Sequence, residues 1–206
     1  MANLKHQFRY LYTSGGEERS EARVTMPFWT EQRFFGGRWI TSWPKTEVRA
    51  SQVGSGPIED VPWTHSLGLF VSPRALEVLL AAGCGPCIQY FEVPLRLRTK
   101  KIVTYFMVNC HRMIDCHNRK QSDLRVSGEV MSFSKFVIDP TMVPPECPMF
   151  VPLNNGPCIV ITEALRDAIV KSGITGFQIS PELPTCEEGK PLAKRWQGRP
   201  LLGLVP

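Results

Sequence analysis

The residues whose types and spacing could carry chemistry are cysteines and histidines in the middle of the chain. They are Cys84 and Cys87 in the sequence CGPC, Cys110 beside His111, and Cys116 beside His117. C-x-x-C is the form of a thioredoxin-like dithiol, and two cysteines combined with a distant cysteine and histidine are a familiar ligand set for structural zinc. These residues therefore raise two hypotheses, a thiol-redox site and a zinc site.

The thiol-redox hypothesis depends on where CGPC lies relative to a helix. A reactive dithiol needs its first cysteine at a helix N-terminus, where unpaired N–H groups stabilise the thiolate. Here Cys84 follows Gly83, which we expect to end a helix. The negative end of the helix dipole then faces the thiols and would raise their pKa values. We therefore favour a structural turn with two small buried thiols, Cys84 and Cys87.

The zinc hypothesis takes Cys84, Cys87, Cys110 and His111 as a tetrahedral ligand set. Structural zinc sites usually combine two short ligand knuckles, and the second half here has no C-x-x-C or H-x-x-x-H of its own. Cys110 and His111 also point to opposite faces if they end a strand. We therefore expect no metal and no cofactor, and keep this ligand set as the alternative.

Motifs for other kinds of catalysis are missing from the sequence. It contains no G-x-S-x-G nucleophile elbow and no G-x-x-x-x-G-K phosphate loop. Neighbouring carboxylates, such as Glu17 with Glu18, lie in polar stretches that are typical of a solvated surface. We therefore expect no catalytic residue and a protein that is not an enzyme.

The segment 69–94 is expected to place CGPC between a helix and a strand. An apolar run stops at Ser72, whose hydroxyl can cap a first helical turn, and Pro73 follows where a missing N–H costs nothing. Apolar residues then recur at helical spacing until Gly83, which suits the left-handed conformation that ends helices. The aromatic and β-branched run after CGPC predicts a strand.

A second segment, 158–181, repeats this strand-helix-strand design. Its cap Thr162 and its stop Gly173 each lie ninety positions after Ser72 and Gly83, so both helices have the same length between cap and stop. A helix of this length between short loops can cross over to make a parallel pair of strands. We therefore predict an α+β or α/β fold, a mixed sheet with two strand-helix-strand units.

Four further stretches complete the expected fold. Residues 3–13 alternate as a strand, with the aromatic residues on one buried face and Leu11 on the other face. Residues 101–109 form a continuous apolar run that suits a central strand, and residues 133–138 suit another strand. Residues 140–157 hold six prolines, and we expect them to wrap the body as a loop.

The N-terminal part, residues 1–60, combines a strand with an aromatic segment rich in proline and glycine. We expect it to pack on a main body formed by residues 61–206, with irregular surface chain at 44–66 as the boundary. The aromatic rings between residues 26 and 43 either cover a core or present an interface, because tryptophan and arginine often anchor one.

The composition is that of an ordinary folded protein. The 206 residues are 43% hydrophobic and 21% charged, with a formal net charge of +5. Lysines and arginines are scattered among acids, so nucleic-acid binding stands as an alternative and not as the first choice. The chain shows no secretory signal and no apolar run near the ~20 residues of a membrane span, and its seven cysteines are an odd number. We therefore expect a cytoplasmic protein.

Several blocks between residues 60 and 182 share a pattern of core and cap residues. They are LFVSPRALEVLLAAG followed by IQYFEVPL, then YFMVNCHRMIDCHNRKQS, FSKFVIDP and IVITEALRDAIVKSGITGFQISP. With Tyr105, Asn109, Asp115 and Ser122 at family-like positions, this region resembles the myxobacterial-type immunity proteins of bacterial polymorphic toxin systems. CGPC and the Cys-His pairs are not features of that family.

The resemblance implies a non-enzymatic protein that binds and neutralises, by occlusion, one cognate toxin encoded nearby. A nuclease is one candidate class of toxin, and the alternatives are a thiol-redox or structural-zinc protein and a nucleic-acid-binding protein. An interface of this kind needs exposed aromatic and arginine side chains. The predicted partner-binding residues are therefore Trp29, Phe34, Phe35, Arg38 and Trp39.

Overall fold

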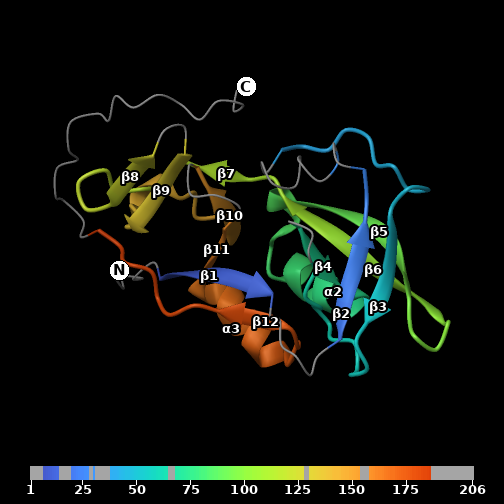
Figure 1. Ribbon diagram of the computed structural model, residues 1–206. Helices are drawn as coiled ribbons and strands as arrows, with labels where there is room; N and C mark the ends of the chain where they lie inside the picture. The colour runs from blue at the N-terminus through green and yellow to red at the C-terminus, as the bar shows by residue number, and fades with distance from the viewer. Residues whose placement is uncertain are drawn as a thin grey trace.

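The structure, a computed structural model, shows an α+β fold built around two mixed sheets (Figure 1). It describes residues 7–13, 20–27, 30, 38–64, 68–127, 130–153 and 158–186. Two α-helices are described in full, α2 (Pro73–Ala81) and α3 (Glu163–Ser172), together with two short 3-10 helices, η1 (Gly85–Cys87) and η2 (Pro140–Met142). The predicted fold class is confirmed.

Ten of the described strands form two five-stranded sheets, and two more form a separate hairpin. Sheet 1 has the order β12 (Phe177–Ile179), β1 (Phe8–Thr13), β11 (Ile159–Thr162), β10 (Met149–Pro152) and β7 (Met113–Ile114). Sheet 2 has the order β2 (Glu21–Thr25), β3 (Arg49–Val53), β5 (Ile88–Arg96), β6 (Ile102–Cys110) and β4 (Leu69–Val71). The hairpin pairs β8 (Asp123–Ser127) with β9 (Val130–Lys135).

Each predicted strand-helix-strand unit forms around an inserted third strand. The strands β4 and β5 run parallel to each other because both pair antiparallel with β6, which lies between them. The strands β11 and β12 are likewise parallel, and β1 lies between them, antiparallel to both. The two predicted units are thus confirmed, but the outer strands of each unit do not pair directly.

The ends of both helices are the ones that the sequence predicts. The side-chain oxygen of Ser72 accepts a 3.1 Å hydrogen bond from the Ala75 N–H, and that of Thr162 accepts one of 3.4 Å from the Leu165 N–H. After each helix a glycine takes a left-handed conformation, and the φ of Gly173 is +65°. The local capping residues therefore set both helix lengths.

Three expectations for single strands are wrong. In β1, Leu11 is as buried as Phe8, with 3% and 1% of their surfaces exposed, so both faces of the strand are covered. The strand β9 ends at Lys135 and does not continue to residue 138. The proline-rich stretch 140–157 contains the buried strand β10, because its prolines flank an apolar run that pairs with β11 on one side and β7 on the other.

The described part of residues 1–60 supplies three strands to the two sheets. The strand β1 lies inside sheet 1, and β2 and β3 form one side of sheet 2. The stretch 44–66, expected to be irregular surface chain, contains β3, which pairs with β2 and β5. The N-terminal residues are therefore hydrogen-bonded into both sheets.

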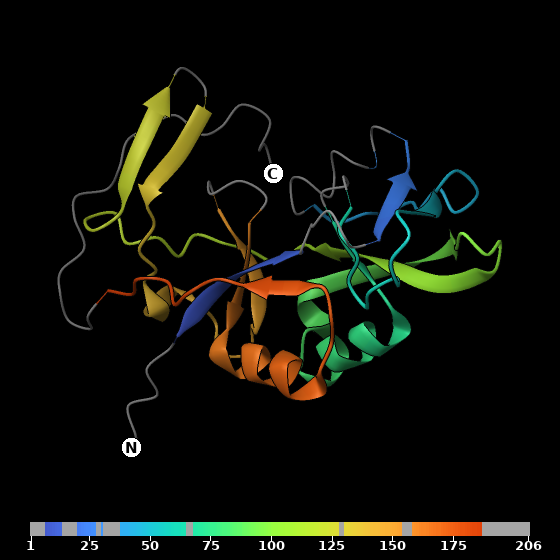
Figure 2. The same ribbon diagram turned by 60° about the horizontal axis from the view of Figure 1, so that its bottom comes forward.

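Two hydrophobic cores lie on the two faces of sheet 2. The larger core contains residues of both helices and both sheets, including Leu69 and Val71 of β4. The smaller core lies on the opposite face, where residues 40–58 pack against Phe70 and Met107. Figure 2 shows α2 and α3 side by side on the same side of the two sheets. Sheet 2 is therefore covered on both faces near α2.

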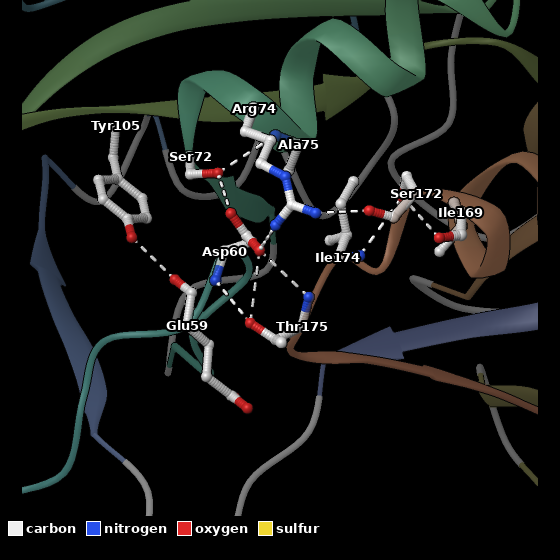
Figure 3. A network of polar contacts seen from close by, with 10 residues as sticks. All are labelled: Glu59, Asp60, Ser72, Arg74, Ala75, Tyr105, Ile169, Ser172, Ile174 and Thr175. Carbon is white, nitrogen blue, oxygen red and sulfur yellow. Dashed lines mark hydrogen bonds and ion pairs between the residues drawn. The ribbon is translucent and has the colours of Figure 1, made fainter.

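A polar network joins the two units where their loops meet (Figure 3). One carboxylate oxygen of Asp60 accepts a 2.8 Å hydrogen bond from the Ser72 hydroxyl. The other accepts hydrogen bonds of 2.9 Å from Arg74 and 3.2 Å from the Thr175 N–H. Arg74 also donates to the carbonyl oxygen of Ser172 at the end of α3. Because Ser72 caps α2, the same network orients that helix and holds it to the loop after α3.

Next to this network, the backbones of Val61 and Gly176 lie in direct contact. The Val61 N–H donates a 3.0 Å hydrogen bond to the Thr175 carbonyl oxygen. Gly176 has a φ of +95°, and a Cβ atom at this position would lie 2.1 Å from the carbonyl oxygen of Val61. A side chain at residue 176 would therefore push the two units apart.

Replacing Gly176 by alanine should destabilise the protein far more than the same change at Gly83. Gly83 is a matched control, because its φ is +85° and a Cβ atom there would meet nothing within 4 Å. We expect Gly83→Ala to cost about 1–2 kcal/mol from backbone strain alone. Gly176→Ala adds the overlap with Val61 and should cost about 3 kcal/mol or more. Urea denaturation measures both, and equal losses would contradict the close approach.

Candidate functional site

Trp39 is an exposed aromatic residue whose ring packs against one neighbouring side chain. Its side chain is 58% exposed, and its ring meets the His111 imidazole edge to face, with 4.7 Å between the ring centroids and 78° between the planes. Large aromatic side chains at a surface are typical anchors of protein interfaces. The structure therefore makes Trp39 the centre of a candidate binding surface.

Side chains of sheet 2 hold the backbone that carries Trp39. The side-chain amide of Gln89 accepts a 2.8 Å hydrogen bond from the Ile40 N–H and donates one of 3.0 Å to the Ile40 carbonyl oxygen. The Asn109 amide donates a 2.7 Å hydrogen bond to the Arg38 carbonyl oxygen. Ile40 is buried, whereas its neighbour Trp39 is exposed. A backbone fixed in this way has little conformational entropy left to lose on binding.

The other predicted partner-binding residues fall into two groups. Arg38 is exposed and precedes Trp39 in the chain, so the two form a short exposed aromatic and cationic pair. Trp29, Phe34 and Phe35 lie outside the described residues. Of the five predicted residues, the structure therefore describes two, and both lie at the surface.

Two exposed apolar residues of sheet 2 are absent from the predicted set. Tyr90 on β5 and Ile102 on β6 are 47% and 65% exposed, and the Tyr90 ring lies edge-on to Phe106 with 6.1 Å between the centroids. Both strands have nine residues and span roughly 30 Å, whereas the nine residues of α2 span roughly 14 Å. The hairpin continues past α2 (Figure 2), so strand length relative to helix length is the signal for Ile102, which lies at the far end of the hairpin.

The cysteines of both chemical hypotheses gather in the larger core. Cys84, Cys87 and Cys110 are 0%, 2% and 5% exposed. Cys147, which precedes β10 and belongs to neither hypothesis, joins them, and its sulfur atom lies 3.3 Å from that of Cys87. The sequence gives no signal for this contact, because the two residues meet only when β10 enters sheet 1. CGPC is a turn with two buried thiols, as predicted.

The pKa values of these thiols differ from those of a C-x-x-C redox site. Burial raises the pKa of Cys84 to about 12 and also raises that of Cys110. The hydrogen bond with Cys147 lowers the pKa of Cys87 and raises that of Cys147. The expected rise is therefore found at Cys84, where burial causes it, and is wrong at Cys87. A C-x-x-C redox site needs a low pKa at its first cysteine, and here that thiol has a high one.

Three of the four alternative zinc ligands, Cys84, Cys87 and Cys110, lie in the larger core. The ring of the fourth, His111, contacts Trp39. Across the part of the chain that the structure describes, no group of three or more His, Cys, Asp or Glu side chains is arranged to hold a metal ion. The geometry therefore lends no support to Cys84, Cys87, Cys110 and His111 as a zinc site.

The second Cys-His pair has a structural environment of its own. Burial raises the pKa of Cys116 to about 12. The Nδ1 atom of His117 lies 2.8 Å from the carboxylate of Asp115, which also pairs with Arg119 at 2.9 Å. Asp115 is thus held by two neighbours from its own loop, and this cluster orders the chain before β8.

No protein-family model matches the chain, and no curated protein matches it. No helix among the described residues is long and apolar enough to cross a membrane. The fold and the site therefore define the class of protein by themselves: an α+β protein with an exposed tryptophan held by two inner strands, β5 and β6, of a mixed sheet.

Two histidines should make the protein less stable in mild acid. Burial lowers the pKa values of His111 and His117 below the ordinary value of 6.5. The unfolded chain then binds protons more readily, so the free energy of unfolding falls as the pH drops through that value. Urea denaturation at about pH 7.5 and about pH 5.5 measures the change, and His111→Gln should reduce it. The same pH dependence in variant and wild type would contradict the effect assigned to His111.

Proposed function

We propose that this protein is a non-enzymatic immunity protein that binds a cognate bacterial toxin encoded nearby and neutralises it by occlusion. The observation that carries the proposal is the exposed Trp39 side chain on a backbone held by Gln89 and Asn109. Tryptophan and arginine are the residues that most often dominate the binding energy of protein interfaces. The exposed Arg38 beside Trp39 supplies both types at one place.

The resemblance to immunity proteins supports the same function through two residues. Asn109 and Tyr105 stand at family-like positions, and both hold the N-terminal part of the chain. The Asn109 amide donates to the Arg38 carbonyl oxygen, and the Tyr105 hydroxyl donates a 2.8 Å hydrogen bond to the Glu59 carbonyl oxygen. Of these two residues of β6, Asn109 thus positions the backbone next to Trp39, and Tyr105 holds the chain at Glu59.

Occlusion is the mode of inhibition that suits this chain. An inhibitor that imitates nucleic acid would carry a large negative charge, whereas this protein has a formal net charge of +5. A nuclease toxin would therefore be neutralised by covering its surface and not by filling its site with a mimic. Such covering needs a stable interface, for which a pre-ordered aromatic anchor is well suited.

Trp39→Ala should weaken binding of the purified toxin encoded next to this gene by about 2 kcal/mol, a roughly thirtyfold rise in Kd. Val170→Ala is the matched control, because Val170 on α3 has the same exposed fraction of 58%. Isothermal titration calorimetry measures both affinities, and unchanged circular dichroism shows that the fold is kept. An unchanged Kd for the Trp39 variant would remove that residue from the interface.

The thiol alternative predicts a different outcome for a second variant. If Cys84 and Cys87 are both replaced by serine, an immunity protein that acts by occlusion should still protect cells that express the toxin. A protein that acts through these thiols would lose protection. Both residues are buried, so a variant with only Cys84→Ser, which leaves the contact between Cys87 and Cys147, controls for lost stability. If the double variant is present at the same level as the wild-type protein but no longer protects the cells, the occlusion proposal is contradicted.

A further inference from the structure

The register of sheet 2 places three arginines on one exposed surface. Arg23 on β2 lies opposite Ser51 on β3, and Ser51 lies opposite Arg96 on β5. Arg49 is two positions before Ser51 and so lies on the same face of β3. All three arginines are exposed. Neighbouring strands are ~4.8 Å apart, so Arg23 and Arg96 start roughly 10 Å from each other on this face.

The opposite face of the same strands fixes this orientation. Ala22, Ala50 and Leu95, each next to one of the arginines in the chain, are buried in the smaller core. Because side chains alternate along a strand, their neighbours Arg23, Arg49 and Arg96 must point to the other side. None of the three arginines forms an ion pair with another described residue.

Apolar surface lies directly beside these charges. Ile102 on β6 is opposite Arg96 in the register and is 65% exposed, and Pro94 on β5 is exposed as well. Two acids lie on the same face: Glu21 is two positions from Arg23 along β2, roughly 7 Å away, and Glu92 is four positions from Arg96 along β5, roughly 13 Å away. We call the surface of Arg23, Arg49, Arg96 and Ile102 the arginine face.

We propose that the arginine face docks an acidic surface of the partner protein. Three cations on one face, with an exposed isoleucine beside Arg96, combine charge complementarity with an apolar contact, which is the make-up of a protein interface. The proposal rests on the proposed function and adds to it the chemistry of the toxin surface. The face lies at the far end of β5 and β6 from Trp39, so it forms a second region of the interface.

A nucleic acid fits this face less well than a protein does. Single-stranded nucleic acid is held by cations together with aromatic rings on which bases stack. Among the described residues, the large exposed aromatic ring on this face of β5 is that of Tyr90, six positions from Arg96 and roughly 20 Å away. Among the described residues beside Arg96, the exposed apolar side chains are those of Ile102 and Pro94, which are aliphatic and not aromatic.

The test compares two variants that lose the same charge. One carries Arg23→Ala, Arg49→Ala and Arg96→Ala, and the control carries Lys45→Ala, Lys120→Ala and Lys135→Ala, three exposed lysines elsewhere. Stopped-flow kinetics measure the association rate with the purified toxin at low and at physiological salt. The arginine variant should associate about tenfold more slowly at low salt, and the control should stay within about twofold of wild type.

A third variant separates charge from shape. Replacing the same three arginines by lysine keeps the positive charge and should retain most of the association rate and its dependence on salt. If the variant with three arginines replaced by alanine and the control with three lysines replaced by alanine associate equally slowly, the proposal is overturned. A wild-type association rate that does not change with salt would overturn it as well. In either case, a rise in the Kd for the toxin on Trp39→Ala would still support the proposed function. If the wild-type protein does not bind the toxin at all, the proposed function is itself contradicted.

Nucleic acid is tested with a fluorescein-labelled single strand of DNA of about 20 nucleotides. We expect no binding at physiological salt that depends on the three arginines. Binding that weakens steeply with salt and is lost in the arginine variant would assign this face to nucleic acid and overturn the proposal.

Discussion

The backbone contact between Val61 and Gly176 is the constraint on which the two-unit arrangement depends. Each unit buries only one side of its helix on its own strands, and the larger core forms when α2 and α3 lie side by side. That placement requires the loop before β4 to meet the loop after α3 without side-chain atoms between them. Asp60 then ties the cap of α2 to the same loop, so the geometry of one junction is transmitted to both helices.

The parts of the fold that could be predicted are those fixed by neighbours in the sequence. Ser72 and Thr162 cap helices through hydrogen bonds to residues three positions away, and such local contacts can be predicted from the sequence. The strand β10 could not be predicted in this way. It pairs with β11 and with β7, which is distant in the sequence, and the prolines around it are typical of a loop. The burial of Leu11 likewise follows from sheet neighbours that a single strand does not reveal.

The candidate site shows the same division. Residue type alone predicts Trp39 and Arg38 as partner-binding residues, and the structure shows that both are exposed. The backbone around Trp39 is held by Gln89 and Asn109, which lie some fifty and seventy positions further along the chain. A pattern of neighbouring residues does not reveal such long-range contacts. The cysteines were the most visible chemical feature of the sequence, yet their surroundings are apolar and their nearest sulfur contact is with Cys147. The arginine face became visible only once the register of three strands was known.

The insertion of β1 between β11 and β12 also orders events in time. Phe8 pairs with Thr162 and Leu11 with Ile179, residues more than 150 positions apart, whereas β5 and β6 are joined by a short turn. Local pairs form early and distant pairs late, since the chain between them must first be closed into a loop. During synthesis the N-terminal strand β1 therefore has no partner in sheet 1 until β11 has been made, and β12 joins its other side afterwards. The hairpin of sheet 2 can fold before then, and sheet 1 closes last.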